Sequence, residues 1–235
     1  MKELTPTGKL RVGVNLGNFL LVQRNPDGSI RGIVPDLAQE LAQRLGVQAE
    51  LRKYEKVGEV ADGAKKGEWD VAFIGAEPQR AAEIDFTAPY VEIEANYLVP
   101  AGSAIRSVDE VDREGVRIAV AGRSAYHLWL ERNVKRAQLV VGDSIEGSYQ
   151  VFVKDKLEAL AGLKPRLMED LAKLPGARIL DGRFTSVQQA IGTPKGRPEG
   201  AAYLRTFAED VKASGLVAQL IERHGIKGLT VAAAA

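Results

Sequence analysis

Cysteine is absent from this chain of 235 residues, and histidine, tryptophan and methionine each occur only twice. The lack of cysteine excludes disulfides, thiolate metal sites and cysteine nucleophiles, and it suits a compartment in which thiols oxidise. Because the two histidines lie far apart in the sequence, no recognisable metal-binding set is present. We therefore expect neither a metal nor another cofactor.

A net charge is also nearly absent, because 32 basic residues face 31 acidic ones. No basic segment is interleaved with aromatic residues, so we expect no nucleic-acid partner. No apolar run is long enough to cross a bilayer. The first ten residues, "MKELTPTGKL", are polar rather than the core of a signal peptide, so an export signal, if one existed, is expected to have been removed from this sequence.

Strand and helix patterns alternate in the first ninety residues. Strands are predicted at "KLRVGVNL", "VQAELRKY" and "WDVAFIG", where apolar residues alternate or run together. Helices are predicted at "PDLAQELAQRLG" and "VGEVADGAKKGE", and Asp36 is expected to cap the first of them. This alternation is typical of an α/β sheet with parallel strand pairs.

A second α/β unit is predicted to begin near Val108, after the apolar strand "ANYLVPAGS". The pattern restarts with strand "VRIAVAG", helix "SAYHLWLERN", strand "QLVVGD" and helix "GSYQVFVKDKLEALAG". Later strands are predicted at "ARILDG" and "QQAIGTPKG". Two helices, divided near Ser214 and Gly215, close the chain.

Several of these stretches together resemble one known family. They are "KLRVGV", "GIVPDLAQELAQRLG", "KKGEWDVAFIG", "PQRAAEIDFTAPY", "GVRIAVAGRSAY" and the C-terminal segment from "IGTPKG" to "IERHG". Their order is similar to that of bacterial extracellular solute-binding proteins, in the family that includes the polar amino acid receptors of ABC transporters. The resemblance covers nearly the whole chain, and "PQRAAEIDFTAPY" is its most specific part.

The resemblance implies a two-lobed α/β fold of the type II periplasmic-binding-protein class, with two crossing hinge strands. Lobe 1 is then expected to comprise residues 1–92 and 189–235, lobe 2 residues 98–182, and the hinges residues 93–97 and 183–188. A small anionic or zwitterionic ligand would be held between lobes that close around it. The implied protein is a periplasmic or extracellular monomer that delivers its ligand to an ABC transporter permease.

Arg80 follows the apolar strand "VAFIG", where an arginine is either a solvated charge or a binding group for an anion. Its planar guanidinium can pair a carboxylate through two charge-assisted hydrogen bonds. The resemblance implies this role for Arg80, and Gly75 would let the backbone approach the ligand closely. Asp85, Phe86 and Tyr90 are expected to shape the turn and the hinge.

A second candidate is the turn "AGRSAY", in which Gly122 follows a strand and Ser124 opens a helix. Free N–H groups at a helix start bind anions, and the serine hydroxyl adds a donor. The resemblance implies that this turn binds the same carboxylate, although an ordinary N-cap serine would have the same sequence. Arg123 either points to the ligand or points to water, and His127 either packs in the helix or reaches the ligand.

Other positions depart from what the resemblance implies. Leu163, or Gly162 beside it, stands where an acidic residue would pair the ligand's ammonium group, and Glu158 lies upstream. Asn18 and Val57 stand where aromatic residues would enclose the ligand, and Glu77 replaces a small hydroxyl residue. The pattern predicts a carboxylate clamp without an evident amine clamp. The candidate ligand-binding residues are Asn15, Asn18, Val57, Gly75, Glu77, Arg80, Gly122, Arg123, Ser124 and Leu163.

Two alternative functions remain open from the sequence. Cyclohexadienyl dehydratases resemble these receptors, and Glu77 or Glu55 would then be the general acid. The second alternative is that the chain is the ligand-sensing domain of a membrane receptor. The leading interpretation is a receptor without catalysis that captures an amino acid or a similar organic acid.

Overall fold

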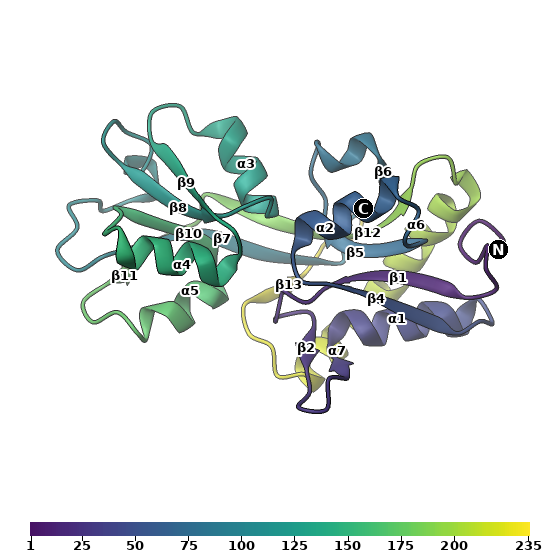
Figure 1. The fold of residues 1–235 in the computed structure, drawn as a ribbon. Coiled ribbons are helices and arrows are strands. Elements are labelled where there is room, and N and C mark those ends of the chain that lie inside the picture. Colours follow the sequence, from purple (N-terminus) through teal and green to yellow (C-terminus); the bar gives the residue numbers. More distant parts are fainter. The chain divides into compact units, whose positions relative to one another are not determined.

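A computed structural model describes all residues from Met1 to Ala235 (Figure 1). The chain divides into two compact units. Unit 1 comprises Met1–Glu92 and Gln188–Ala235, and unit 2 comprises Ile93–Val187. Two strands, β7 (Val91–Val99) and β12 (Thr185–Pro194), each carry the chain from one unit into the other.

Unit 1 is built on parallel strands with helices packed against them. Its other elements are β1 (Leu10–Asn15), β2 (Gln23–Arg24), β3 (Ile30–Arg31), α1 (Ile33–Arg44), β4 (Ala49–Tyr54), α2 (Val57–Lys65), β5 (Val71–Gly75), the short 3-10 helix η1 (Arg80–Ala82), β6 (Ile84–Phe86), α6 (Pro198–Ala213), α7 (Leu216–Arg223) and β13 (Leu229–Val231). Strand β1 pairs in parallel with β4 and β5, and β12 pairs antiparallel with β5 and β6. The predicted parallel α/β arrangement of this segment is therefore confirmed.

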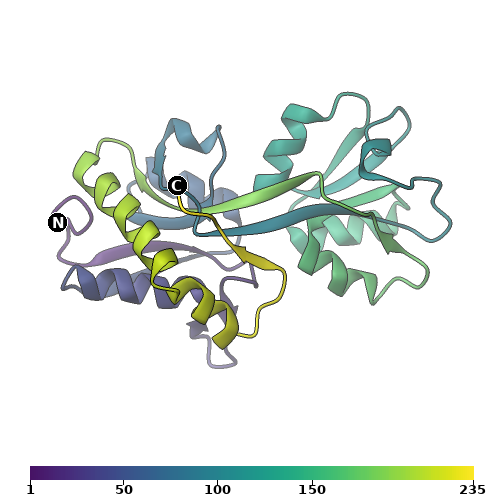
Figure 2. The same ribbon diagram turned by 180° about the vertical axis from the view of Figure 1, so that it is seen from behind.

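The helices of unit 1 lie on these strands. Helix α1 packs against β1 and β4, and α2 packs against β1, β4 and β5 (Figure 1). The C-terminal helices α6 and α7 contact each other, and α7 also contacts α1 (Figure 2). All five residues of β5 are buried, as expected for a strand at the centre of a covered sheet.

Helix α1 begins two residues earlier than the sequence indicates. Its N-cap is Gly32, whose φ is 131°, and a Cβ there would come within 2.5 Å of the Leu21 carbonyl oxygen. Asp36 lies in the first turn instead of capping the helix, and its Oδ2 accepts a hydrogen bond from His224 Nε2 at 2.8 Å. The expected cap was wrong because the required backbone conformation favours glycine at position 32.

Unit 2 repeats the same plan. Its elements are η2 (Val108–Glu110), β8 (Arg117–Ala121), α3 (Ala125–Asn133), β9 (Gln138–Gly142), α4 (Ile145–Lys154), β10 (Ala159–Leu163), α5 (Lys164–Leu171) and β11 (Arg178–Ile179), with part of β7 and β12. Strand β8 pairs in parallel with β9 and β10, whereas β7 pairs antiparallel with β10 and β11. Helix α4 packs on β8, β9 and β10.

The helix predicted over residues 147–162 is wrong in its second half. Helix α4 ends at Lys154, and Lys156 then has a φ of 49°, which a continuing right-handed helix does not allow. The next segment forms β10, in which all five residues are buried between β7 and β8. A short apolar run has no period that separates a buried strand from a buried helix, so only its neighbours settle which forms.

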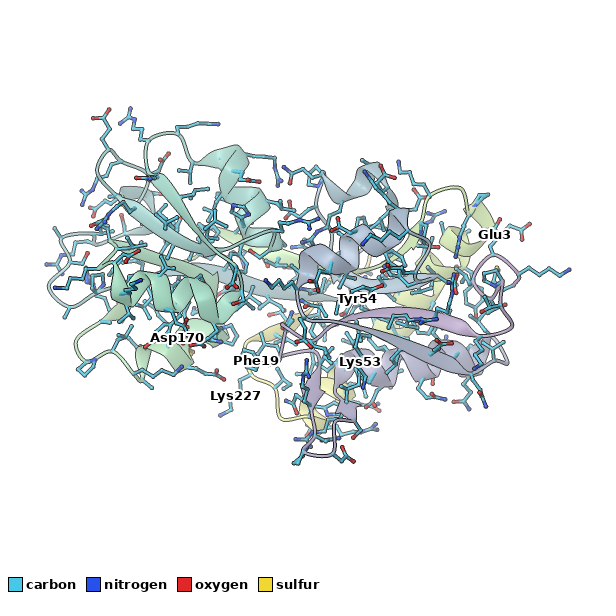
Figure 3. All side chains as sticks on the ribbon, viewed as in Figure 1. Glu3, Phe19, Lys53, Tyr54, Asp170 and Lys227 are labelled. Atoms are coloured by element: carbon cyan, nitrogen blue, oxygen red, sulfur yellow. The ribbon has the colours of Figure 1, made fainter.

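Trp69 is the largest fully buried side chain of unit 1, and it fixes the position of α2. Its Nε1 donates to the Val60 carbonyl at 2.8 Å. Tyr54, labelled in Figure 3, ends β4 and donates its hydroxyl to Glu68 Oε2 at 2.7 Å. Gly63 leaves room for both rings, because a Cβ there would lie 2.6 Å from Trp69 Nε1 and 2.8 Å from the Tyr54 hydroxyl.

We therefore expect Gly63→Ala to destabilise the protein, although Gly→Ala inside a helix normally stabilises it by about 1 kcal/mol. Overpacking against Trp69 is expected to cost about 1–3 kcal/mol. Urea unfolding followed by circular dichroism measures the free energy of unfolding. Trp69→Phe removes the Nε1 atom, so the cost of Gly63→Ala should shrink in that background. An equal cost in both backgrounds would contradict the explanation.

Candidate functional site

The candidate residues of unit 1 gather at one edge of its sheet. Strands β1, β4 and β5 run in parallel, so their carboxyl ends meet at the same edge, where α/β proteins commonly bind ligands. The connections after these strands are in contact, because Leu16 N–H donates to the Tyr54 carbonyl at 2.9 Å. The residues placed at this edge are Asn15, Asn18, Val57, Gly75, Glu77 and Arg80.

Arg80 is buried at this edge, with only 5% of its surface exposed. It begins the short helix η1, and its N–H donates to the Glu77 carbonyl at 2.9 Å. The side chain folds back so that Nη1 donates to the Gly75 carbonyl at 2.6 Å. Gly75 thus supports the guanidinium. A guanidinium carries five N–H donors and a permanent positive charge. At the end of a sheet it can therefore donate hydrogen bonds to an anion.

The other candidates of unit 1 hold the loops in shape. Asn15 Oδ1 accepts from Gly17 N–H at 3.0 Å, and buried Asn18 accepts from Leu20 N–H through its Oδ1 at 3.3 Å. Val57 is the first residue of α2 and packs against the core that contains Trp69. Glu77 is half-buried, and its carbonyl also accepts from Ala81 N–H at 3.0 Å.

Thr87 and Tyr90, which follow Arg80 in the sequence, stabilise the segment between η1 and β7. Thr87 N–H donates to the Ile191 carbonyl at 2.9 Å, and Ile191 N–H returns a hydrogen bond to Thr87 Oγ1 at 3.1 Å. Tyr90 is fully buried, edge-on to Phe73, and its hydroxyl has no hydrogen-bond partner. Burial therefore raises the pKa of the Tyr90 phenol far above its usual range.

In unit 2 the candidate turn also lies at the carboxyl edge of parallel strands. Gly122 follows β8, and its N–H donates to the Gly142 carbonyl, the last residue of β9, at 2.8 Å. A Cβ at position 122 would come within 2.9 Å of Val141 Cγ1, so glycine keeps the two connections together. Leu163, the last residue of β10, lies at the same edge.

Ser124 is the N-cap of α3, and its hydroxyl bonds to the backbone of the turn. The Oγ accepts from His127 N–H at 3.1 Å and donates to the Ala121 carbonyl at 2.8 Å. The predicted N-cap is confirmed, and the hydroxyl hydrogen is committed to the backbone. The N–H groups of Ala125 and Tyr126, the first two residues of α3, have no acceptor in the protein. These amides, and not the hydroxyl, are the donors available to an anion.

His127 is a neighbour of this turn that the sequence left undecided. It is 6% exposed, and its Nδ1 accepts a hydrogen bond from Arg123 N–H at 2.9 Å. Arg123 is exposed and has a φ of 59°, in the left-handed region. Burial lowers the pKa of His127 from its ordinary value of 6.5, and the nearby Glu131 acts in the opposite direction.

Tyr126 packs on the other side of the same turn. Its side chain is 3% exposed, and burial raises the pKa of Tyr126 to about 12, while a hydrogen bond with Ser124 acts in the opposite direction. Tyr126 and His127 therefore enclose the Gly122–Ser124 turn. Arg123 is the only charged residue within this turn.

Leu163 brings no carboxylate to the edge of unit 2. It is 6% exposed and precedes α5 as its N-cap. Glu158, five residues earlier, forms a two-pronged ion pair with Arg117 at 2.8 and 2.9 Å, and this hydrogen bonding lowers the pKa of Glu158. Glu158 is thereby committed to the opposite end of β10, where it holds β8 in register.

An acidic group that the sequence analysis missed lies beside Leu163. Glu94 precedes Ala95, the register partner of Leu163 on β7. Its carboxylate accepts from Lys164 Nζ at 3.1 Å and from Arg183 Nη1 at 3.4 Å. Lys164 lies 70 positions from Glu94 in the sequence, and Arg183 lies 89 positions from it, so no local sequence pattern indicates the cluster.

Comparison with known proteins gives a consistent result. Residues 10–227 match the family model of bacterial extracellular solute-binding proteins, family 3. The chain is 22% identical over 227 residues to the L-cystine-binding protein TcyJ of Escherichia coli, which covers 95% of this chain and 85% of that protein.

Solved structures share the fold. The amino acid ABC transporter substrate-binding protein AbpA of Streptococcus pneumoniae, bound to L-arginine, has a TM-score of 0.78 and 21% identity, covering 95% of this chain and 97% of that one. The ancestral amino acid-binding protein AncCDT-1, a precursor of cyclohexadienyl dehydratase, has a TM-score of 0.77 and 22% identity, covering 94% of this chain and 97% of that one. The predicted type II periplasmic-binding-protein fold is confirmed by these likenesses.

Proposed function

Because this chain belongs to the bacterial extracellular solute-binding proteins of family 3, we propose that it captures a small carboxylate for an ABC transporter. The ligand is an amino acid or a similar organic acid. The observation that carries the proposal is the buried Arg80, whose guanidinium stands at the carboxyl edge of three parallel strands. A guanidinium can pair a carboxylate through two charge-assisted hydrogen bonds, so a ligand carboxylate suits this position.

The second part of the proposal concerns unit 2. The Gly122–Ser124 turn presents the Ala125 and Tyr126 amides, which supply backbone donors for a carboxylate. The chain passes between the units only within β7 and β12, which supports hinges at residues 93–97 and 183–188. Hinge closure on the ligand is the expected motion.

A receptor without catalysis explains the site better than an enzyme does. Glu55, one of the two acids considered for a dehydratase, is exposed and paired with Arg24. Glu77 is half-buried and supports η1 through its carbonyl. No group of histidine, aspartate or glutamate side chains is arranged to hold a metal ion, and no helix is long and apolar enough to cross a membrane. Incubation of concentrated protein with prephenate, followed by product analysis, tests the dehydratase alternative.

The proposal predicts binding of a small carboxylate that need not carry an α-amino group. Calorimetry against L-cystine, L-arginine, L-lysine and L-glutamine, each beside the matched acid that lacks the amine, measures the preference. An unpaired ammonium is costly to bury, and Leu163 offers it no partner, so we expect the matched acids to bind at least as tightly. A ligand at a hundredfold excess over its Kd should also stabilise the protein by about 2.7 kcal/mol.

Two results would correct this expectation in different ways. Tight binding of an amino acid with a much weaker matched acid would mean that an acidic partner for the ammonium exists, and Glu77, Glu55 and Glu94 would be replaced by their amides to find it. Absence of binding across the panel would contradict the carboxylate assignment itself. Leu163→Asp adds the missing acid and should raise the affinity for the amino acids relative to the matched acids.

A further inference from the structure

We propose that His127 is a positioning residue whose neutral imidazole holds the Gly122–Ser124 turn in its ligand-binding shape, and whose protonation opens that turn. The effect on a ligand rests on the proposed function, whereas the effect on the turn does not. The motivating observation is the hydrogen bond of 2.9 Å from Arg123 N–H to His127 Nδ1.

This hydrogen bond supports a strained backbone. Arg123 has a φ of 59°, one of only two positive φ values at a residue other than glycine. Such a residue persists in the left-handed region when its surroundings hold it there. The peptide of Arg123 is tied to His127, and His127 N–H in turn donates to Ser124 Oγ at 3.1 Å. The turn and the first turn of α3 therefore depend on each other through His127.

The hydrogen bond also assigns the state of the ring. Because Nδ1 accepts from Arg123 N–H, it must carry a lone pair and no hydrogen. The ring hydrogen is then on Nε2, which lies 3.6 Å from Glu131 Oε1. A protonated ring would carry hydrogens on both nitrogens, so Nδ1–H and Arg123 N–H would face each other as two donors. The ring or the Arg123 peptide has to move in that state.

The charged groups near the ring are Glu131, Arg123 and Asp143. Glu131, on the next turn of α3, faces Nε2. Arg123 faces Nδ1 through its backbone and is itself a cation. Across the turn, Asp143 follows Gly142 and accepts from Ser144 Oγ at 2.9 Å. Opening of the turn would move the Ala125 and Tyr126 amides, which are the donors offered to a carboxylate.

The direction of the pH dependence follows from burial. Because burial lowers the pKa of His127 below 6.5 in the folded protein, the neutral ring dominates at and above this value. The contribution of the ring to stability is fully present above pH 6.5. It declines as the pH falls from 6.5, where an unfolded chain takes up the proton, through the lower pKa of the folded protein. Carboxylate binding should decline over the same acidic range.

The first experiment uses the complete chain labelled with nitrogen-15 and no ligand. Nuclear magnetic resonance of the imidazole nitrogens and of the Arg123 amide is followed from pH 8 to pH 4.5. We expect an unprotonated Nδ1 at neutral pH, and a change of the Arg123 amide that titrates with His127. A hydrogen on Nδ1 at neutral pH, or an Arg123 amide that does not respond to His127, would overturn the proposal.

The second experiment uses sodium acetate as the carboxylate probe, with sodium chloride at equal ionic strength as the reference. Acetate is titrated while the Ala125 and Tyr126 amides are observed. We expect affinity to fall roughly tenfold when His127 becomes protonated, the effect of losing about one hydrogen bond to a charged group. If acetate leaves these amides unmoved at neutral pH, the carboxylate role of the turn is wrong, while the first experiment still decides the role of His127 in the turn.

Variants separate positioning from general stability. His127→Asn places an amide oxygen near the position of Nδ1 and does not titrate, whereas His127→Leu offers no acceptor. The leucine variant should bind ionised acetate weakly at every pH. Asparagine should restore the affinity for ionised acetate, and this affinity should not depend on pH. Glu131→Gln should move the transition to lower pH, and His224→Asn, at the other histidine, should not move it. An asparagine variant that keeps the acidic transition would overturn the proposal.

Discussion

Arg80→Ala is expected to weaken ligand binding by about ten- to a hundredfold. A hydrogen bond to a charged group contributes about 1.5–3 kcal/mol, which corresponds to that range of affinity. The guanidinium is buried and folded back on the Gly75 carbonyl, so its position does not have to be fixed when the ligand arrives. Calorimetry with the tightest-binding acid of the panel measures the loss.

Two further variants show whether the guanidinium or only its charge is required. Arg80→Lys keeps the charge but lacks the planar pair of donors, so it should recover only part of the affinity. Arg205→Ala removes an exposed arginine of α6 and should leave binding unchanged. Circular dichroism of each variant checks that unit 1 is folded. Binding by folded Arg80→Ala within twofold of the original protein would refute the role of Arg80.

Asp70→Asn is expected to cause a large loss of stability in unit 1. The carboxylate is fully buried and accepts from Arg11 at 2.7 and 2.9 Å and from Arg197 at 3.0 Å. It also accepts from the Arg11 backbone N–H at 3.2 Å. Removing one partner of a buried charge pair costs about 3–5 kcal/mol, because the remaining charges lose their counter-ion.

The side chains of Arg11 and Arg197 are 17% and 21% exposed, so water relieves part of this cost. We therefore expect a loss near the lower limit, about 3 kcal/mol, and a fall in Tm of roughly 6–12 °C for a protein of this size. Calorimetric unfolding provides both values. Glu40→Gln, which breaks the half-exposed pair with Arg44 on α1, is the matched control and should cost no more than about 0.5 kcal/mol. Equal losses in the two variants would contradict the importance of burial.

The same aspartate shows why stability could not be located from the sequence. "WDVAFIG" predicts a strand, but it does not indicate that Asp70 joins β1 to the segment before α6. Its partners lie 59 and 127 residues away in the chain. Only the parallel pairing of β1 with β5 and the return of the C-terminal segment bring the three side chains together.

The alternation of apolar strands and amphipathic helices was enough to predict the α/β class, because strand and helix periods are local properties of the chain. The stretch "PQRAAEIDFTAPY" likewise indicates Arg80 and the family from the sequence alone. These predictions depend on residues that are neighbours in the sequence. Where the local pattern was ambiguous, as in the apolar run "ALAGL", the predicted helix was wrong.

The sequence by itself thus determined the α/β class, the order of most elements and the position of the candidate arginine. The tertiary structure alone decided that β10 is a strand, that Glu94 is paired with Lys164 and Arg183, and that Arg123 is bound to His127 in a left-handed conformation. The physical reason is that burial, ion pairing and backbone strain depend on segments brought together from distant parts of the chain. A short-range pattern carries propensities, whereas these interactions require partners in fixed positions.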